Sequence, residues 1–427
     1  MLKRTRSFLV LVMLLMTVTM SAQVTTATMS GKVTAQDEPI IGATIVAIHE
    51  PSGTRYGTVT NVSGQFNLQG MRTGGPYKVE ISYVGYQTAI YKGINLLLGE
   101  NYVLNVSLKE SSELLDEVVV TASKESNMKS DRAGAIMNAN RDMISNTPTI
   151  SRSISDIMRL SPQGADVGNG FAVGGGNYRQ SFVTVDGAAF NNTFGLGGNL
   201  PANGSPISLD ALEQVTVAVT PFDVRQSGFT GGAINAVTRS GDNQFRGTAY
   251  MYFNNENLKG SKVDDYELLR SKAQYYTYGA SFGGPIIKDK LFFFVNGEYE
   301  DNVTAGSNYR PRTALGESYS GGNIHRPLQS DMDDMRGFLL NKYNFDPGKY
   351  NDYSTDTPAY RVMARVDWNA NQNNKVSFRF TKTHTKDSNF PTSSVSPLST
   401  SALYPGGTST EVIDGKPVGT IAPGQGR

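Results

Sequence analysis

The clearest pattern of hydrophobic and polar positions lies between Pro358 and Lys386. Apolar and polar side chains alternate from Tyr360 to Asn369, and a second alternating run covers Val376 to Thr381. A period of two puts the two kinds of side chain on opposite faces of a β-strand, here one apolar face and one largely polar face. The polar Asn/Gln segment between the runs predicts a tight turn. Such a hairpin is typical of a transmembrane β-barrel, but a soluble β-sandwich shows the same alternation.

The connections between similar runs favour the membrane interpretation. Three further stretches alternate with period two: Phe245–Phe253, Tyr276–Phe282 and Leu291–Glu300. Together with the hairpin they predict five strands. The connections alternate in length, since residues 254–274 and 301–357 are long and polar whereas 283–290 and 370–374 are short. Outer-membrane barrels have short periplasmic turns and long extracellular loops, and a soluble sandwich has no reason to sort its loops by length.

The N-terminus has the three parts of a secretory signal peptide. Lys3, Arg4 and Arg6 precede an apolar run, Phe8–Val18, and Ala22 provides a small residue at the expected cut. The apolar run is too short to cross a bilayer comfortably. We therefore predict that residues 1–22 are removed after Sec-type export, and that the mature protein leaves the cytoplasm.

Residues 28–109 are predicted to form a small all-β domain. Short runs rich in Val, Ile and Tyr are separated by Gly, Pro and Asn turns at regular spacing, which is typical of a sandwich. The fragments Gly31–Val33, Ile41–Ala43, Gly64–Phe66 and Ser82–Tyr86 resemble the carboxypeptidase-regulatory-like, prealbumin-type domain. The resemblance implies a folding unit without peptidase chemistry. The sequence also lacks an H-E-x-x-H zinc motif, so no enzyme is expected.

A short acidic and β-branched segment follows this domain. In the stretch 113–123, Asp116 and Glu117 stand before Val118, Val119 and Val120, which favour an extended backbone, and Thr121 and Ala122 follow. One interpretation is a further buried strand or a linker with acidic flanks. The other is a peptide that adds itself as a strand to the sheet edge of a second protein. Its place between a β-domain and a Gly-rich domain favours the second interpretation.

The segment LDEVVVTA after a regulatory-like domain resembles the TonB box of TonB-dependent outer-membrane receptors of the Bacteroidetes type. Residues 131–240 resemble the plug domain of these receptors. The matching pieces are Ile154–Pro162, Val183–Gly187, Leu209–Val217 and Gly231–Arg239. This resemblance implies that Asp116, Glu117, Val118, Val119, Val120, Thr121 and Ala122 contact a TonB-type energising protein in the periplasm. It also implies outer-membrane lipid and an extracellular ligand as further partners.

The local pattern of residues 131–240 agrees with this resemblance. Apolar residues at helical spacing predict a helix over Ser153–Leu160, which Pro162 ends, and Asp186-Gly187 is a turn signal. Gly174–Gly176 lacks the spacing of a phosphate-binding loop and is predicted to be a turn. The "RG" pair of siderophore carriers is not present here, which leaves the kind of ligand open. The run Phe282–Tyr299 resembles the Oar-like branch more than the SusC glycan importers.

Composition excludes several other chemistries. The formal net charge is +1, which gives no polyelectrolyte signal, so nucleic acid is not an expected partner. There are no cysteines and only three histidines, far apart in sequence. The aspartates of residues 301–357 lack the spacing of a calcium loop and are predicted to lie in a solvated loop. We expect no catalytic residues, no cofactor and no metal.

The predicted fold is mainly β: a small prealbumin-like sandwich, an α+β plug domain, and the first strands of an incomplete antiparallel transmembrane β-barrel over residues 245–427. Five strands are too few to close a barrel, so we expect the sequence to be a fragment or a truncated reading frame. The expected function is energised uptake across the outer membrane of a peptide, glycan, metal chelate or vitamin. The alternative is a surface adhesion or structural protein without transport.

Overall fold

The structure is a computed structural model. It describes residues 25–110, 118–121, 136–149, 152–167, 170–192, 198, 200–201, 205–219, 228–258, 260, 262–263, 266–267, 272–305, 310–317, 324–350, 353–371, 374–386, 409–413 and 416–421. The predicted signal peptide and Asp116, Glu117 and Ala122 lie outside these residues. Contacts divide the chain into two compact units. The first contains Met1–Ala249, Gly279–Glu298 and Tyr360–His384, and the second contains Tyr250–Tyr278, Tyr299–Ala359 and Thr385–Arg427.

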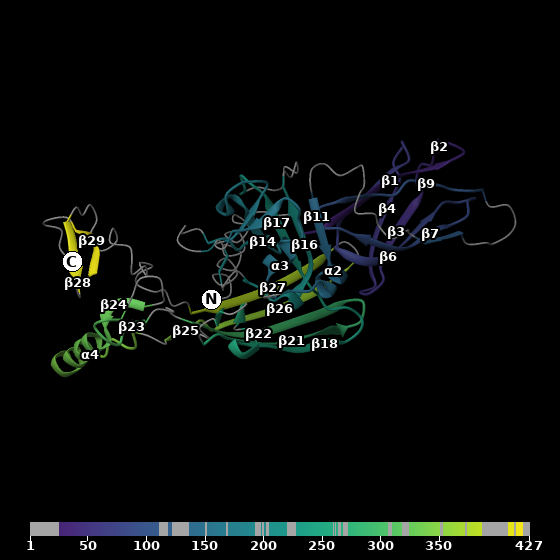
Figure 1. The fold of residues 1–427 in the computed structure, drawn as a ribbon. Coiled ribbons are helices and arrows are strands. Elements are labelled where there is room, and N and C mark those ends of the chain that lie inside the picture. The colour runs from purple at the N-terminus through teal and green to yellow at the C-terminus, as the bar shows by residue number, and fades with distance from the viewer. Residues whose placement is uncertain are drawn as a thin grey trace, which may run out of the picture. The chain divides into compact units, whose positions relative to one another are not determined.

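The first unit begins with an N-terminal domain of two five-stranded sheets (Figure 1). In one sheet β1 (Ala27–Ala35) pairs with β2 (Glu38–Pro39), β5 (Gln65–Met71), β8 (Asn101–Val103) and β9 (Val106–Ser107). The other has the order β10 (Val118–Thr121), β7 (Ala89–Leu96), β6 (Gly74–Ser82), β3 (Thr44–His49) and β4 (Thr54–Val59). Met29 and Phe66 from one sheet and Ile45 and Ile81 from the other belong to one buried cluster. The predicted sandwich is therefore confirmed.

A middle domain, defined as the described residues from 136 to 239, follows in the first unit. Its sheet has the order β11 (Ile136–Asn140), β16 (Leu212–Ala218), β17 (Ala233–Thr238), β14 (Phe182–Val185) and β15 (Ala188–Ala189). The remaining elements are helices α2 (Arg141–Asn146) and α3 (Ile154–Met158), the hairpin of β12 (Gly164–Asp166) and β13 (Phe171–Val173), and the 3-10 turns η1 (Tyr178–Gln180) and η2 (Leu209–Ala211). The predicted helix is confirmed, one residue shorter at its N-terminal end and two residues shorter at its C-terminal end.

The predicted turn at Asp186-Gly187 is also confirmed. It joins β14 to β15, with Val185 opposite Ala188. Both turn residues have positive φ, 51° for Asp186 and 83° for Gly187. Two consecutive residues with positive φ give the backbone twist that fits a tight hairpin, and Asp and Gly tolerate this conformation well. Every residue of the neighbouring strand β17 is buried, so the turn lies at the end of a tightly packed part of the sheet.

The five predicted strands after residue 245 are all present and pair in one sheet. They are β18 (Arg246–Asn255), β21 (Gln274–Ile287), β22 (Leu291–Ala305), β26 (Ala359–Asn369) and β27 (Lys375–Thr385), and the order in the sheet follows the order in the sequence. A short sixth strand, β25 (Ser354–Asp356), pairs antiparallel with the end of β22. We refer to β18, β21, β22, β26 and β27 as the strand array.

The strand array exposes its apolar face and buries its polar face. On β26, Arg361 is only 2% exposed, whereas Val362 is 43% and Trp368 46% exposed. The other buried polar residues of the array are Thr277, Ser281, Asn296, Glu298, Glu300, Arg365 and Asp367. The exposed apolar residues include Met251, Phe253, Tyr278, Phe282, Val295, Tyr299, Val376, Phe378 and Phe380. This is the reverse of the polarity of a soluble sandwich.

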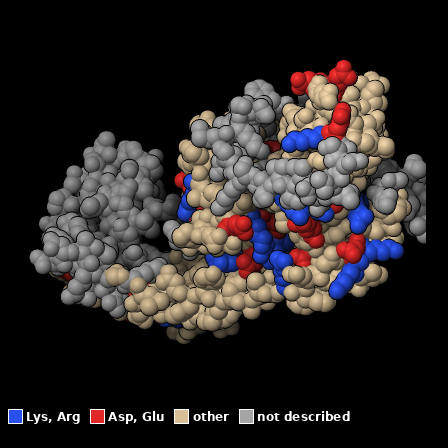
Figure 2. Space-filling model, turned by 90° about the vertical axis from the view of Figure 1, so that its right-hand side faces the viewer, with Lys and Arg blue, Asp and Glu red and all other residues tan. Residues whose placement is uncertain are grey.

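The surface view agrees with this reversed polarity. Figure 2 shows few charged side chains in the lower part of the face that it draws, where Figure 1 places β18, β21 and β22. Lys, Arg, Asp and Glu are interspersed above that part. An apolar outer face of this kind suits hydrocarbon, in which strands must also satisfy their backbone hydrogen bonds by pairing. In the described part of the chain, none of the helices has the length and hydropathy needed to span a bilayer.

The second unit corrects one expectation. Residues 301–357 were predicted to be a solvated loop, but they contain a helix of 15 residues, α4 (Gln329–Tyr343). None of its residues is buried, so the helix gives no clear apolar stripe in the sequence. Tyr350 donates a hydrogen bond to Asp333 at 2.6 Å, and Arg336 pairs with Asp346 at 2.9 Å. Asp333 and Asp346 thus bind neighbouring side chains.

The other elements of the second unit are short. They are η3 (Glu256–Leu258) and three two-stranded sheets: β19 (Lys262–Val263) with β20 (Tyr266–Glu267), β23 (Arg310–Arg312) with β24 (Ile324–Leu328), and β28 (Ser409–Ile413) with β29 (Lys416–Ile421). The pairing of β23 with β24 is parallel and the other two are antiparallel.

His49 is a buried titratable group of the N-terminal domain whose charge affects stability. Burial, and to a smaller extent the Arg72 guanidinium, lowers the pKa of His49 from 6.5 to about 3. Its Nδ1 lies 2.7 Å from Ser52 Oγ, and its ring packs edge-on against Tyr77. The folded domain therefore holds neutral histidine at pH values where the unfolded chain binds a proton. Such a group contributes stability above pH 6.5, and this contribution falls as the pH decreases toward 3.

We predict that the free energy of unfolding of the N-terminal domain falls by about 2 kcal/mol between pH 7 and pH 5 because of His49 alone. Urea unfolding of the protein, followed by hydrogen exchange in β3 and β4, measures this quantity. The control is His49→Gln, which cannot take up a proton and should lose this part of the pH dependence. An equal pH dependence in both proteins would show that His49 is not responsible.

Candidate functional site: the buried polar network

The inner face of β26 carries the polar side chains that connect the domains of the first unit. Arg361, Met363, Arg365 and Asp367 occupy alternate positions, so their side chains leave the strand on the same face. All four are buried. Met363 joins the buried apolar cluster of the middle domain, and so does Phe294 from β22. The middle domain therefore packs directly against the inner face of the strand array.

The first group of contacts centres on Arg361. Its Nη1 donates to Glu298 Oε1 at 3.0 Å, which joins β26 to β22. Its Nε donates to the main-chain oxygen of Ser205, and Ser208 Oγ donates to Glu298 Oε2 at 2.9 Å. Both serines belong to the middle domain. Each member of this buried ion pair is thus bonded to its partner and to the middle domain.

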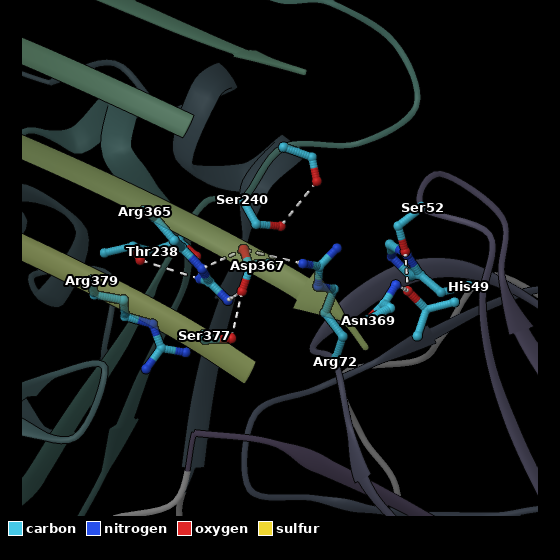
Figure 3. A network of polar contacts seen from close by, with 12 residues as sticks. His49, Ser52, Arg72, Thr238, Ser240, Arg365, Asp367, Asn369, Ser377 and Arg379 are labelled. Carbon is cyan, nitrogen blue, oxygen red and sulfur yellow. Dashed lines mark hydrogen bonds and ion pairs between the residues drawn. The ribbon is translucent and has the colours of Figure 1, made fainter. Parts of the chain in front are cut away.

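The second group centres on Asp367 (Figure 3). Arg365 binds it with two hydrogen bonds, from Nε at 2.8 Å and from Nη2 at 3.1 Å. Ser377 Oγ, from the next strand, donates to the same carboxylate at 2.6 Å. The remaining nitrogen of Arg365, Nη1, donates to the main-chain oxygen of Thr238 at 2.5 Å. One arginine therefore connects a carboxylate of the array to the last residue of β17.

A separate set of bonds fixes the end of β17 to the turn at Asp186. Thr238 donates to the two carboxylate oxygens of Asp186, from its main-chain N at 3.0 Å and from its hydroxyl at 2.5 Å. Arg379 of β27 forms an ion pair with Asp186 at 3.5 Å. The Asp-Gly turn that the sequence predicted thus also supplies a carboxylate to the network.

The N-terminal domain joins the same network. Arg72 Nη2 lies 3.3 Å from Asp367 Oδ2, so this carboxylate is shared by two guanidinium groups (Figure 3). Asn369 Nδ2 donates to Thr54 Oγ1 at 2.9 Å, and the main-chain N of Asn243 donates to the oxygen of Pro51 at 2.9 Å. Asp367 is consequently bonded to the strand array directly, to the N-terminal domain through Arg72, and to the middle domain through Arg365.

His49, Ser52 and Thr54 form a hydrogen-bonded row beside this joint (Figure 3). The row continues to the amide of Asn369 and contains no carboxylate that could orient the histidine. All three side chains are buried in the N-terminal domain. The row therefore forms part of the contact between the N-terminal domain and β26. Among the described residues, no group of three or more His, Asp or Glu side chains is placed to hold a metal ion.

Four of the seven predicted site residues lie in the described part of the chain. Val118, Val119, Val120 and Thr121 form β10, which pairs in parallel with β7 of the N-terminal domain. The predicted extended backbone is therefore confirmed. The polar network was missed by the sequence analysis. The sequence feature that could have revealed it lies in β26, where Arg361, Arg365 and Asp367 occupy alternate positions. A transmembrane barrel directs the polar set of alternate side chains toward its interior.

Two family models match parts of the chain. The model of the carboxypeptidase regulatory-like domain matches residues 28–109, and that of the outer membrane beta barrel domain matches residues 237–413. "TonB-dependent transporter Oar" of Myxococcus xanthus is 27% identical over 58% of this chain. "TonB-dependent receptor SusC" of Bacteroides thetaiotaomicron is 29% identical over 60% of this chain. The chain is homologous to TonB-dependent transporters.

The chain spans less than a quarter of the length of these relatives, 22% of Oar and 24% of SusC. Among solved structures, the siderophore receptor PirA from Acinetobacter baumannii is similar with 16% identity and a TM-score of 0.40. This match covers 59% of the present chain and 31% of that receptor. The relatives are transporters and receptors, not enzymes. The match to the outer-membrane barrel family and the homology to these transporters support an outer-membrane location.

We predict that Asp367→Asn destabilises the protein by about 3–5 kcal/mol, because it leaves Arg365 buried without a carboxylate. The double variant Arg365→Met/Asp367→Leu also removes the Arg365 charge and leaves only Arg72, which is partly exposed, without its carboxylate, so it should recover part of this loss. The midpoint of thermal or urea unfolding measures both effects. A matched control is Glu80→Gln, which breaks the partly exposed ion pair with Lys78 and should cost ~1 kcal/mol or less. A double variant as unstable as the single one would contradict this interpretation.

Proposed function

We propose that this protein is an outer-membrane receptor that takes up an extracellular ligand by energised displacement of its middle domain. In this proposal the middle domain is the plug, within the predicted bounds 131–240. The observation that carries it is the packing of the middle domain against the polar inner face of an array whose outer face is apolar. Such an arrangement puts a removable domain inside a membrane-spanning wall. Homology to TonB-dependent transporters supports the same function.

The contacts of the proposed plug suit a domain that has to move without unfolding. Hydrogen bonds and ion pairs at Ser205, Ser208, Asp186 and Thr238 hold it to the array. Of the described residues, the array adds only Phe294 and Met363 to its buried apolar cluster. A polar contact can be exchanged for contacts with water when the domain shifts, since water offers alternative donors and acceptors. The apolar core of the domain has no such substitute and keeps the domain intact. Displacement therefore breaks the polar network and the contacts of Phe294 and Met363, while the other members of the apolar cluster stay together.

The proposed source of force is a TonB-type protein that reaches the chain from the periplasm after Sec-type export. It would pair with the extended segment Asp116–Ala122 through main-chain hydrogen bonds, which make little demand on side chains. Force on this segment is transmitted toward Ile136, where the described part of the middle domain begins. The ligand, whether a peptide, a glycan or a chelate, would bind on the extracellular side. The identity of the ligand does not enter the mechanism.

We predict that Val119→Pro abolishes uptake while surface display stays normal, because proline removes one main-chain donor from the pairing strand. The test uses the native gene in its own host and measures growth on candidate nutrients. An antibody to residues 324–350 measures surface abundance. The control is Val119→Thr, which keeps both the donor and the β-branched side chain. Unchanged uptake by the proline variant at normal display would contradict energised transport and would favour a surface adhesion function.

A further inference from the structure

We propose that the N-terminal domain is a fixed brace on the strand array, and that the plug separates from this brace when it is displaced. This role rests on the proposed function. The domain contacts the array through the loop between β3 and β4 and through Thr54, Tyr56 and Arg72. It is also bonded to the middle domain. The middle domain therefore cannot move relative to the array unless one of these two sets of contacts opens.

The first contacts of the brace lie beside β18, β21 and β22. The main-chain N of Asn243, just before β18, donates to the oxygen of Pro51 at 2.9 Å. Two bonds fix Asn243 to the turn between β21 and β22. Its Nδ2 donates to Asp289 Oδ1 at 2.7 Å, and the main-chain N of Asp289 donates to Asn243 Oδ1 at 2.8 Å. A Cβ atom at Gly53 would lie 3.4 Å from the Cβ of Asp289, so the β3–β4 loop packs directly on this turn.

The other contacts of the brace lie on β26 and β27. Asn369, the last residue of β26, donates to Thr54. Lys375, the first residue of β27, places its Nζ 3.4 Å from the centroid of the Tyr56 ring, and an aromatic ring attracts a cation at this distance. Arg72 adds the ion pair with the buried carboxylate of β26. The contacts thus extend from β18 to β27, across the end of the array that carries its short turns.

The contacts with the middle domain lie on two neighbouring strands of its sheet. The main-chain N of Leu98 donates to Gln214 Oε1 of β16 at 3.1 Å, and Asn138 Nδ2 of β11 donates to Glu100 Oε1 at 2.7 Å. Strands β11 and β16 are paired with each other. A small shift of this sheet therefore breaks both bonds together, and water can take the place of each lost partner.

Two features make the contacts with the middle domain the ones that open. The contacts with the array include a pair of opposite charges and are spread over several strands, whereas each of the two bonds to the middle domain involves no more than one charged group. In addition, residues 111–135 connect the N-terminal domain to the middle domain, and a chain of this length can extend over roughly 80 Å. The plug can therefore travel while the brace stays on the array.

Two disulfide pairs test which set of contacts opens, since the sequence has no cysteine of its own. The array pair, Gly53→Cys/Asp289→Cys, has a Cβ separation close to the value of about 3.5–4.5 Å found in disulfides. In the plug pair, Gly74→Cys/Glu213→Cys, a Cβ atom at Gly74 would lie 3.9 Å from Glu213 Cγ, the atom that a cysteine sulfur replaces. The pairs are matched, because each replaces one acid and one glycine with positive φ, 62° at Gly53 and 87° at Gly74.

Each variant of the full native gene is purified, oxidised and placed in a planar bilayer. A bead that carries the C-terminal domain of the host's TonB-type protein pulls on the protein, and the probe for opening is the potassium chloride current. The yield of each disulfide is measured on the same samples. The same proteins after reduction are the control for folding and for the effect of the substitutions themselves.

We expect both pairs to form disulfides in high yield. The oxidised array pair should open as often as after reduction, whereas the oxidised plug pair should open at least tenfold less often than after reduction. Blocked opening of the oxidised array pair would overturn the brace, because the domain would then have to leave the array. Free opening of both oxidised pairs, or a low disulfide yield in either, would also overturn it. A wild-type protein that does not open would overturn the proposed function, while the disulfide yields would still test the contacts of the brace.

Discussion

The carboxylate of Asp367 accepts bonds from Arg365 and Ser377 and pairs with Arg72, and this buried joint is what the rest of the first unit depends on. Charges buried on the inner face of a strand have to be paired, because an unpartnered buried charge costs several kcal/mol. The need to pair these charges fixes the positions of two domains. The middle domain supplies Thr238, and the N-terminal domain supplies Arg72. The same alternation directs Val362, Val366 and Trp368 to the outer face. One period-two pattern thus determines both the domain contacts and the apolar outer surface of β26.

The first unit has two kinds of contact, and we expect them to respond differently to force. The polar network consists of hydrogen bonds and ion pairs, which can be exchanged for other partners. The cores of the sandwich and of the middle domain are apolar, and water cannot replace the contacts within them. In the proposed mechanism, energy from the periplasm would therefore be used to break the bonds that the middle domain makes in this network, without unfolding a domain.

The sequence predicted those features that depend on local pattern. The five strands of the array, the Asp186-Gly187 turn and the helix at Ser153 all follow from spacing and turn chemistry, and the structure has each of them. Helix α4 was not predicted because none of its side chains is buried, and an exposed polar helix has the same composition as a loop. The network and the pairing of β10 with β7 were not predicted because each needs a non-local partner. The charges of β26 were visible as alternate positions, but nothing local shows that Thr238 or Arg72 lies opposite them.

The central claim is that the apolar face of the strand array meets lipid, and the single tryptophan of the chain reports on that face directly. Trp368 lies on the outer face of β26 and is 46% exposed. Its fluorescence should be measured in bilayers that contain lipids brominated at several depths, and compared with quenching by iodide in the water phase. We predict blue-shifted emission that the brominated lipids quench and that iodide leaves nearly unchanged. Red-shifted emission, quenched by iodide and not by the brominated lipids, would contradict the inverted polarity on which the proposed function rests.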